Sequence, residues 1–164
     1  MGKIIIGIDN GTSGAITIIN DNKVVYRKTP IKVEKSYTKK DQNISRVDFK
    51  ELKRFLEENI KEKEKENGKC LTVLERPLVN PRKFKTTQSA MRSLEATLIC
   101  LEELEIPVKY IDSKEWQKYF FPEIEGREKL KKASLDYGNK KYPELQFEED
   151  ADSLLIAEYS ERFL

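Results

Sequence analysis

The chain of 164 residues contains no histidine, and this absence excludes an imidazole base or an imidazole metal ligand. Cysteine is scarce as well, with only Cys70 and Cys100, which lie 30 residues apart in separate apolar runs. Such surroundings favour buried thiols over a disulfide or a zinc site. The sequence therefore suits a reducing compartment.

Long apolar stretches are also missing. No run of about 18 apolar residues is present, which excludes a membrane-spanning helix of ordinary length. The first residues, MGKIIIGID, lack the charged region, the longer apolar region and the cleavage site of a signal peptide. With 37% charged residues, the sequence predicts a soluble cytoplasmic protein. Its length predicts a single domain over residues 1–164 with a sizeable core.

The net charge of +2 hides a strong segregation of charge along the chain. Residues 23–40 carry seven basic side chains and one acid, and residues 76–94 carry five basic side chains and no acid. Residues 127–141 are basic as well, whereas residues 142–164 carry seven acids against one arginine. Basic segments beside an acidic cluster are typical of a protein that holds a polyanion over bound metal ions. The alternative is that the charges only solvate the surface, which is our interpretation of residues 57–66.

Two apolar runs that predict buried strands end in carboxylates. KIIIGID ends at Asp9, and CLTVLE ends at Glu75. A carboxylate buried at such a place stays ionised only when a cation neutralises it. Glu149 and Asp152, with Asp150 between them, open the apolar segment ADSLLIAEY, and we expect an i, i+3 pair on one helix face. The two strand-end acids and this pair predict an oxygen-only site suited to Mg²⁺ or Mn²⁺.

Turn residues and apolar periodicity predict a regular order of elements. Strands are expected over residues 3–9, 14–20, 23–29, 70–75 and 106–111. Helices are expected over residues 88–105, 113–119 and 127–138 and from about residue 148. An earlier helix is expected after Ser45, which would cap it with Asp48 in the first turn. Residues 30–43 and 76–87 are predicted to be polar loops.

This order of elements is that of the ribonuclease H-like fold. Three antiparallel strands come first, and helix, strand, helix, strand and closing helices follow them. We therefore predict an α/β protein with a mixed five-stranded sheet, three antiparallel strands and then two parallel ones, flanked by helices. No internal repeat interrupts the pattern.

Four motifs in the same order resemble a known family. They are GIDNGTSGAITII in the first strand pair, LERP at the fourth strand, DSKEWQKYFFP with EKLKKASLDYGNKKYP, and EEDADSLLIAEY at the last helix. Together they resemble the RuvC family of Holliday-junction resolvases, particularly its phage-type members. The resemblance implies a Mg²⁺-dependent endonuclease that cuts branched DNA as a homodimer, in the cytoplasm of a bacterial or phage-infected cell.

The family pattern also implies a set of metal ligands, which would be the catalytic residues. They fall at Asp9, Glu75, Glu149 and Asp152. The third position is usually Asp or His in cellular members, so Glu149 departs from the pattern, and Asp150 is an alternative ligand. The resemblance implies two Mg²⁺ ions per site, with Mn²⁺ able to substitute. Without histidine, we expect a metal-bound water as nucleophile and the second ion to stabilise the leaving 3′-oxygen.

The loop at residues 76–87 is the expected place of substrate recognition. LVNPRKFKTTQ combines Arg82, Lys83 and Lys85 with Phe84 and has no periodic apolar pattern. The basic groups would bind phosphates, and Phe84 would stack on or wedge between unpaired bases, unless it packs under its own loop. The resemblance adds further basic residues that are expected near the cut strand, Lys114, Lys118, Lys129 and Lys132.

The glycine-rich turn after the first strand leaves an alternative open. In the nuclease interpretation Gly11 and Gly14 keep the turn tight, and Gly7 avoids a side chain beside the substrate. GIDNGTSGA also resembles the phosphate-binding hairpin of the sugar-kinase and actin superfamily. That architecture needs two such domains, and 164 residues supply one.

Two other functions remain open at this stage. One is a metal nuclease of the same fold that acts on RNA or on DNA flaps, and the other is a nucleic-acid-binding module that does not cleave. The clustered acids argue against the second. The predicted helix over residues 88–105 carries more apolar surface than one sheet contact needs, with Met91 and Ile99 beside its main stripe. This excess predicts a homodimer.

Overall fold

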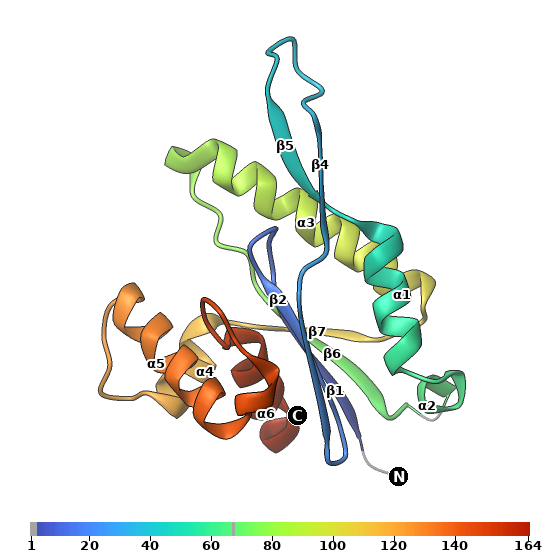
Figure 1. The fold of residues 1–164 in the computed structure, drawn as a ribbon, viewed down its shortest axis with the longest axis vertical. Helices are drawn as coiled ribbons and strands as arrows, with labels where there is room; N and C mark the ends of the chain where they lie inside the picture. Colours follow the sequence, from blue (N-terminus) through green and yellow to red (C-terminus); the bar gives the residue numbers. More distant parts are fainter. Residues whose placement is uncertain (1–2, 67) are drawn as a thin grey trace.

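The fold is given by a computed structural model that describes residues 3–66 and 68–164. Its central sheet has five strands in the order β3-β2-β1-β6-β7 (Figure 1). They are β1 (Ile4–Asp9), β2 (Ala15–Asn20), β3 (Lys23–Lys28), β6 (Cys70–Glu75) and β7 (Val108–Ile111). The first three strands pair antiparallel, and β6 and β7 continue parallel to β1. The predicted mixed sheet is confirmed.

Helices flank this sheet on both faces. The helices are α1 (Phe49–Asn59), α2 (Glu62–Glu66), α3 (Phe84–Glu103), α4 (Ser113–Phe120), α5 (Arg127–Lys141) and α6 (Asp152–Phe163). Alternation along β1 turns Ile4, Ile6 and Ile8 toward a core cluster that they share with α1 and α3. Ile5 belongs to a second cluster, which includes residues of α4 and α6 on the opposite face. The continuous apolar run of β1 therefore reflects burial on both faces.

The two cysteines are free thiols inside the core. Cys70 of β6 and Cys100 of α3 belong to the same apolar cluster. Burial raises the pKa of each thiol to about 11, so neither is reactive at neutral pH. The predicted buried thiols are confirmed. Within residues 3–66 and 68–164, no helix is long and apolar enough to cross a membrane.

Gly7 allows α6 to lie directly on β1. A Cβ atom at this position would come within 2.2 Å of the Ser153 carbonyl oxygen and 2.6 Å of the Ala157 nitrogen. The same helix reaches β2, where the buried hydroxyls of Thr17 and Ser153 are hydrogen-bonded at 2.8 Å. Gly7 therefore serves helix packing, and the expectation that it clears space for a substrate is wrong.

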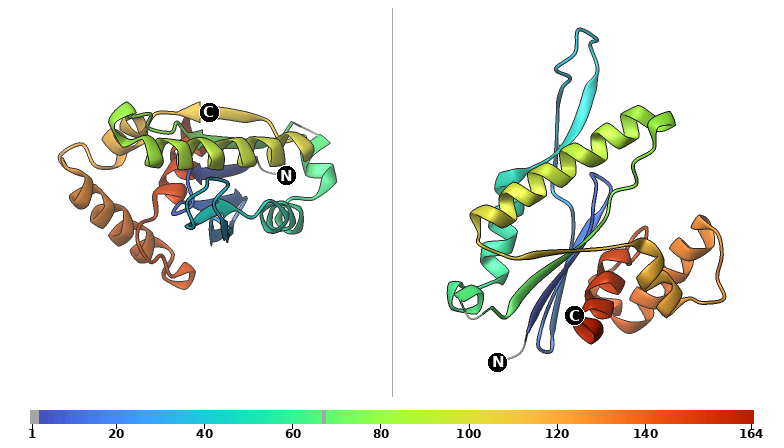
Figure 2. Two further views of the ribbon diagram at one scale, coloured as in Figure 1. Left: turned by 90° about the horizontal axis from the view of Figure 1, so that it is seen from above. Right: turned by 180° about the vertical axis from the view of Figure 1, so that it is seen from behind.

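Residues 30–48 depart most from the prediction. The expected polar loop is a hairpin of β4 (Ile31–Lys35) and β5 (Asn43–Val47), which extends beyond the rest of the molecule (Figures 1 and 2). Ile31 and Val33 are 45% and 62% exposed, so strand pairing rather than burial forms this hairpin. Ser45 lies in β5, and the helix cap is Asp48, whose Oδ1 accepts a hydrogen bond from the Glu51 nitrogen. The predicted Ser45 cap is wrong.

Two helices begin at other residues than predicted: α3 begins earlier and α6 begins later. α3 begins at Phe84, directly after a short 3-10 turn at Pro81–Lys83, so the expected loop is four residues shorter. α6 begins at Asp152, because the chain before it is held in a non-helical path. The Asn139 side chain of α5 accepts from the Phe147 nitrogen at 3.2 Å and donates to the Phe147 carbonyl oxygen at 3.4 Å. The acidic segment is thus fixed against α5 before the last helix starts.

Candidate metal centre

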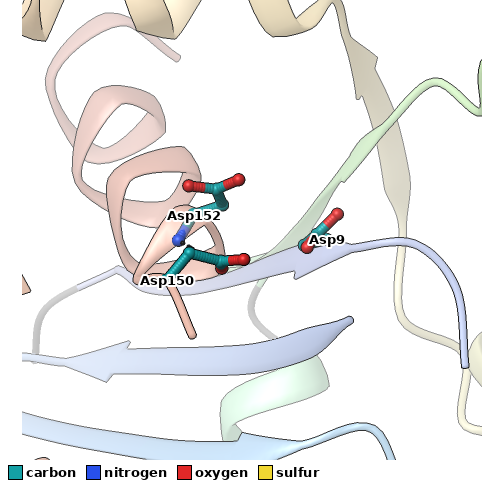
Figure 3. Close-up of side chains that lie close together, drawn as sticks. All are labelled: Asp9, Asp150 and Asp152. Carbon is teal, nitrogen blue, oxygen red and sulfur yellow. Dashed lines mark hydrogen bonds between the residues drawn. The ribbon is translucent and has the colours of Figure 1, made fainter. Parts of the chain in front are cut away.

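Three carboxylates meet where β1 ends and α6 begins (Figure 3). Asp9 is the last residue of β1, and Asp150 and Asp152 come from the chain that leads into α6. One carboxylate oxygen of each lies within 4.8 Å of the others, with Asp150 buried and the other two partly buried. A Cβ atom at Gly14 would come within 2.0 Å of the Asp9 carbonyl oxygen, which explains the tight turn after β1. These elements fix an all-oxygen ligand set.

Glu75 approaches the same place from the neighbouring strand. Because β6 runs parallel to β1, Asp9 and Glu75 end adjacent strands at one edge of the sheet. Both acids line a cleft of about 940 Å³ together with Asp152. The indole nitrogen of Trp116, a fully buried residue of α4, donates a 2.8 Å hydrogen bond to Oε2 of Glu75. The position of this carboxylate is therefore set by the core.

Glu149 lies apart from these carboxylates. Its side chain is 58% exposed, and Oε1 lies 3.3 Å from Nζ of Lys28 on β3. Because α6 begins at Asp152, Glu149 precedes the helix, and the predicted i, i+3 pair on one helix face is wrong. The structure brings Asp150 to Asp9 and Asp152, which is the alternative that the sequence left open.

Two side chains of α5 hold the aspartates in place. The Lys131 ammonium lies 3.0 Å from Oδ2 of Asp150, and the Ser134 hydroxyl donates a 2.6 Å hydrogen bond to Oδ1 of Asp152. The same hydroxyl accepts from the Ala151 nitrogen at 2.9 Å. Neither residue was predicted from the sequence. Their only sequence signal is the i, i+3 spacing on one helix face, which many surface residues share.

Clustering and burial oppose ionisation of these acids. Burial, and then the charges of Glu75 and Asp152, raise the pKa of Asp9 well above its ordinary value. Burial raises the pKa of Glu75 to about 7, against the hydrogen bond from Trp116, which lowers it. Burial and the charge of Asp150 raise the pKa of Asp152 to about 6. Additional positive charge in this cleft would relieve the repulsion, and a divalent cation supplies it.

Basic side chains surround the acids at the cleft. Those that line it are Arg76, Lys83, Lys114, Arg127 and Lys131. Among them, Lys83 and Lys114 were predicted from the sequence as nucleic-acid contacts. Lys118, Lys129 and Lys132 are exposed on α4 and α5 and do not line this cleft. Their DNA contacts remain a prediction.

The segment at Pro81–Lys83 and the start of α3 present the other predicted contact residues. Arg82, Lys83 and Lys85 are exposed there. Phe84, the first residue of α3, is 70% exposed, so the alternative that it packs under its own loop is wrong. Its proposed stacking on DNA bases remains a prediction.

Comparison with known proteins identifies the fold. No protein-family model matches the chain, and no curated protein sequence matches it. Among solved structures, Thermus thermophilus RuvC in complex with a Holliday junction substrate is similar, with a TM-score of 0.50 and 13% sequence identity over 94% of this chain and 90% of that chain. Another T. thermophilus RuvC structure has a TM-score of 0.46 and 15% identity at the same coverage.

The first of these similarities defines the class of structure. Strand order, helix placement and coverage show a ribonuclease H-like fold. Within that class, the chain is structurally similar to RuvC, the Holliday junction resolvase, over nearly its whole length. At 13% identity this similarity concerns the fold alone, and the chemistry depends on the residues of the site.

Proposed function

We propose that the protein is a Mg²⁺-dependent endonuclease that cleaves branched DNA, with four-way junctions as its substrate. The observation that carries the proposal is the convergence of Asp9, Asp150 and Asp152 within 4.8 Å in a cleft bordered by basic residues. A protein that only binds nucleic acid has no use for clustered acids beside its phosphate-binding groups, because they repel the ligand. The similarity to RuvC supports junctions as the first substrate to test.

The residues present fit hard divalent cations. Carboxylate oxygens are the ligands that Mg²⁺ and Mn²⁺ prefer, and the cleft offers them from Asp9, Asp150 and Asp152 with Glu75 beside them. Burial and the charges of neighbouring acids raise the carboxyl pKa values of Asp9 and Asp152, and Lys131, ion-paired to Asp150, supplies one positive charge against them. We propose that these four acids hold two ions, in place of the set with Glu149.

Each residue of the centre then has a distinct task. Mg²⁺ held by these acids would supply an activated water and charge stabilisation for the leaving 3′-oxygen. Trp116 keeps Glu75 turned into the cleft, and Ser134 fixes the rotamer of Asp152. Lys83 and Arg127 line the cleft where the phosphates of the scissile strand would lie, and they would position that strand.

The test is cleavage of matched substrates. Labelled four-way junction, flap, linear duplex and RNA–DNA hybrid are incubated with the protein in Mg²⁺. We expect the junction to be cut first and fastest. Asp9→Asn should keep the fold and junction binding but lose most cleavage, because it removes a charge that holds the ions. Preferred cutting of RNA or flaps would replace the junction proposal, and binding without cleavage of any substrate would contradict nuclease function.

A further inference from the structure

A second hollow lies between the β4–β5 hairpin and the first half of α3. Its volume is about 700 Å³. We name it the hairpin groove, and its principal lining residues are Tyr37, Lys39, Lys40, Phe84, Lys85 and Arg92. The hairpin that forms one wall crosses α3 and extends away from the central sheet (Figures 1 and 2). None of the sequence-based site predictions involves its hairpin residues.

The tip of the hairpin is attached to α3. The Tyr37 hydroxyl accepts hydrogen bonds from Nε2 of Gln88 at 2.5 Å and from Nη1 of Arg92 at 3.2 Å. The Arg92 guanidinium also lies 5.8 Å from the centroid of the Tyr37 ring. These contacts join residues more than 50 positions apart and keep the groove open between two fixed walls.

The chemistry of the groove favours a nucleic-acid strand. Lys39, Lys40, Lys85 and Arg92 line it, and no acidic side chain does among the described residues. Its two aromatic rings, Tyr37 and Phe84, are 65% and 70% exposed. Cations along a groove with exposed aromatic rings are what a single strand needs, because phosphates pair with the cations and unpaired bases stack on the rings. A folded protein or a small anion would use only part of this arrangement.

The hairpin groove adjoins the metal cleft. Ser13 lines the cleft, and its neighbour Thr12 lines the groove. In the same way Lys83 lines the cleft, and its neighbour Phe84 lines the groove. The two hollows therefore lie side by side at the β1–β2 turn and the start of α3. A strand that leaves the cleft across Phe84 enters the groove.

We propose that the hairpin groove binds the unpaired part of the DNA strand that continues from the scissile phosphate. The identity of this strand rests on the proposed nuclease function. Lys39 and Lys40 contact its phosphates, and Phe84 stacks on a base at the boundary between the two hollows. The hairpin thereby favours substrates in which base pairs open beside the cut, as they do at a DNA branch point.

Binding without cleavage tests this proposal. Fluorescence anisotropy without Mg²⁺ compares a blunt duplex with the same duplex carrying a single-stranded tail, over a range of salt concentrations. Lys39→Ala/Lys40→Ala should lose most of the preference for the tailed duplex. For this double variant and the tailed duplex, the magnitude of the slope of log K against log salt should decrease by about 1.4. This is about 0.7 for each lost contact to a single strand. Both lysines are exposed, so melting should not change.

The matched control removes the same charge elsewhere. Lys50→Ala/Lys61→Ala alters two exposed lysines that line neither hollow and should keep the tail preference. An equal preference for the tailed duplex in the two double variants would overturn the proposal. Tighter binding of the wild-type protein to an RNA tail than to a DNA tail would overturn it as well. Loss of tail binding in the hairpin variant alone would uphold the groove even if the wild-type protein cut no substrate, and in that case only the nuclease proposal would fail.

Discussion

At the scale of single residues, the candidate metal centre depends on side chains that do not themselves contribute carboxylates. Trp116 donates to Glu75, Ser134 donates to Asp152, and Lys131 pairs with Asp150. Each contact fixes a carboxylate that repulsion from its neighbours would otherwise turn outward. Positioning contacts of this kind commonly change metal affinity or activity by about 10–100-fold.

Ser134→Ala tests this positioning role. The variant removes the 2.6 Å hydrogen bond to Oδ1 of Asp152, so Mg²⁺ affinity or cleavage should fall by about 10–100-fold. The measurement is cleavage rate against Mg²⁺ concentration, with a melting curve on the same sample. Ser160→Ala is the control, because Ser160 is an equally buried hydroxyl of α6 that donates to the Ile156 carbonyl oxygen of its own helix. Equal Mg²⁺ dependence in both variants would remove Ser134 from the centre.

The raised pKa of Glu75 predicts a pH-dependent stability in the absence of metal. Its pKa lies at about 7 in the folded protein, above the ordinary value of 4.5. The stability that protonated Glu75 contributes to the folded state is therefore fully present below about pH 4.5. It is lost as the pH rises through about 7. Glu75→Gln removes the titration and keeps a group that accepts from Trp116. In EDTA the variant should melt higher than the wild type near pH 8, by several degrees, and equal it near pH 4.

Two comparisons make this result specific. Glu128→Gln, an exposed change on α5, should leave the melting temperature unchanged at both pH values. Added Mg²⁺ should raise the melting temperature of the wild type more than that of Glu75→Gln. The bound ion supplies positive charge that offsets the Glu75 carboxylate, and the variant lacks this carboxylate. A higher melting temperature of the wild type than of Glu75→Gln near pH 8 without metal would contradict this prediction. It would show that positive charge of the protein already compensates the ionised Glu75 carboxylate.

At the scale of elements, the start of α3 is the place where the two hollows lie side by side. Its first residue, Phe84, is 70% exposed and follows the basic turn Pro81–Lys83. A large apolar side chain at such a position contributes little to the core, since it leaves most of its surface in water. We expect it to act on DNA, where unpaired bases offer a stacking partner.

Phe84→Ala should separate DNA contact from stability. Lost stacking is worth about 1–3 kcal/mol per base, so junction cleavage should slow by roughly ten- to a hundredfold. Melting and binding of blunt duplex should stay nearly unchanged, because exposed substitutions shift stability by about 0.5 kcal/mol or less. Phe163→Ala, a 55% exposed aromatic that lines neither hollow, is the control and should leave cleavage intact. Normal junction cleavage by Phe84→Ala would leave this ring without a function in substrate binding.

At the scale of the whole molecule, one chain supplies one carboxylate cluster among the described residues. A four-way junction has two-fold symmetry, so paired cuts in opposed strands need two active sites. The apolar residues Met91 and Ile99 of α3 are 42% and 47% exposed, while Leu94 and Leu101 of the same helix are buried. We expect a homodimer that covers this exposed face of α3.

Met91→Glu/Ile99→Glu tests the dimer. Charge on this face should convert the protein to a folded monomer in light scattering, since neither residue lies in the core. The monomer should still bind Mg²⁺ but cut only one strand of a junction at a time. Lys50→Glu/Lys61→Glu, on exposed residues of and beside α1, should leave the mass unchanged. A wild-type protein of monomeric mass at working concentration would rule out this interface.

Local sequence signals account for the sheet and for three of the four acids that we assign to the metal centre, Asp9, Glu75 and Asp152. Apolar runs predict β1 and β6, and strand ends place Asp9 and Glu75 at one edge because parallel neighbours end together. The fourth acid is Asp150 in place of the predicted Glu149, because α6 begins only at Asp152. The chain before that start is held against α5 by the contact between Asn139 and Phe147. No local pattern in the sequence encodes this contact.

The sequence by itself determined the fold, the buried thiols and the two strand-end carboxylates, because local periodicity indicates which apolar runs are buried. Tertiary structure alone decided the β4–β5 hairpin, the α5 side chains that hold the aspartates, and the groove that adjoins the metal cleft. These features arise from pairs of groups distant in sequence, such as Tyr37 with Arg92. Which groups meet is set by the packing of whole elements, and no single segment carries that information.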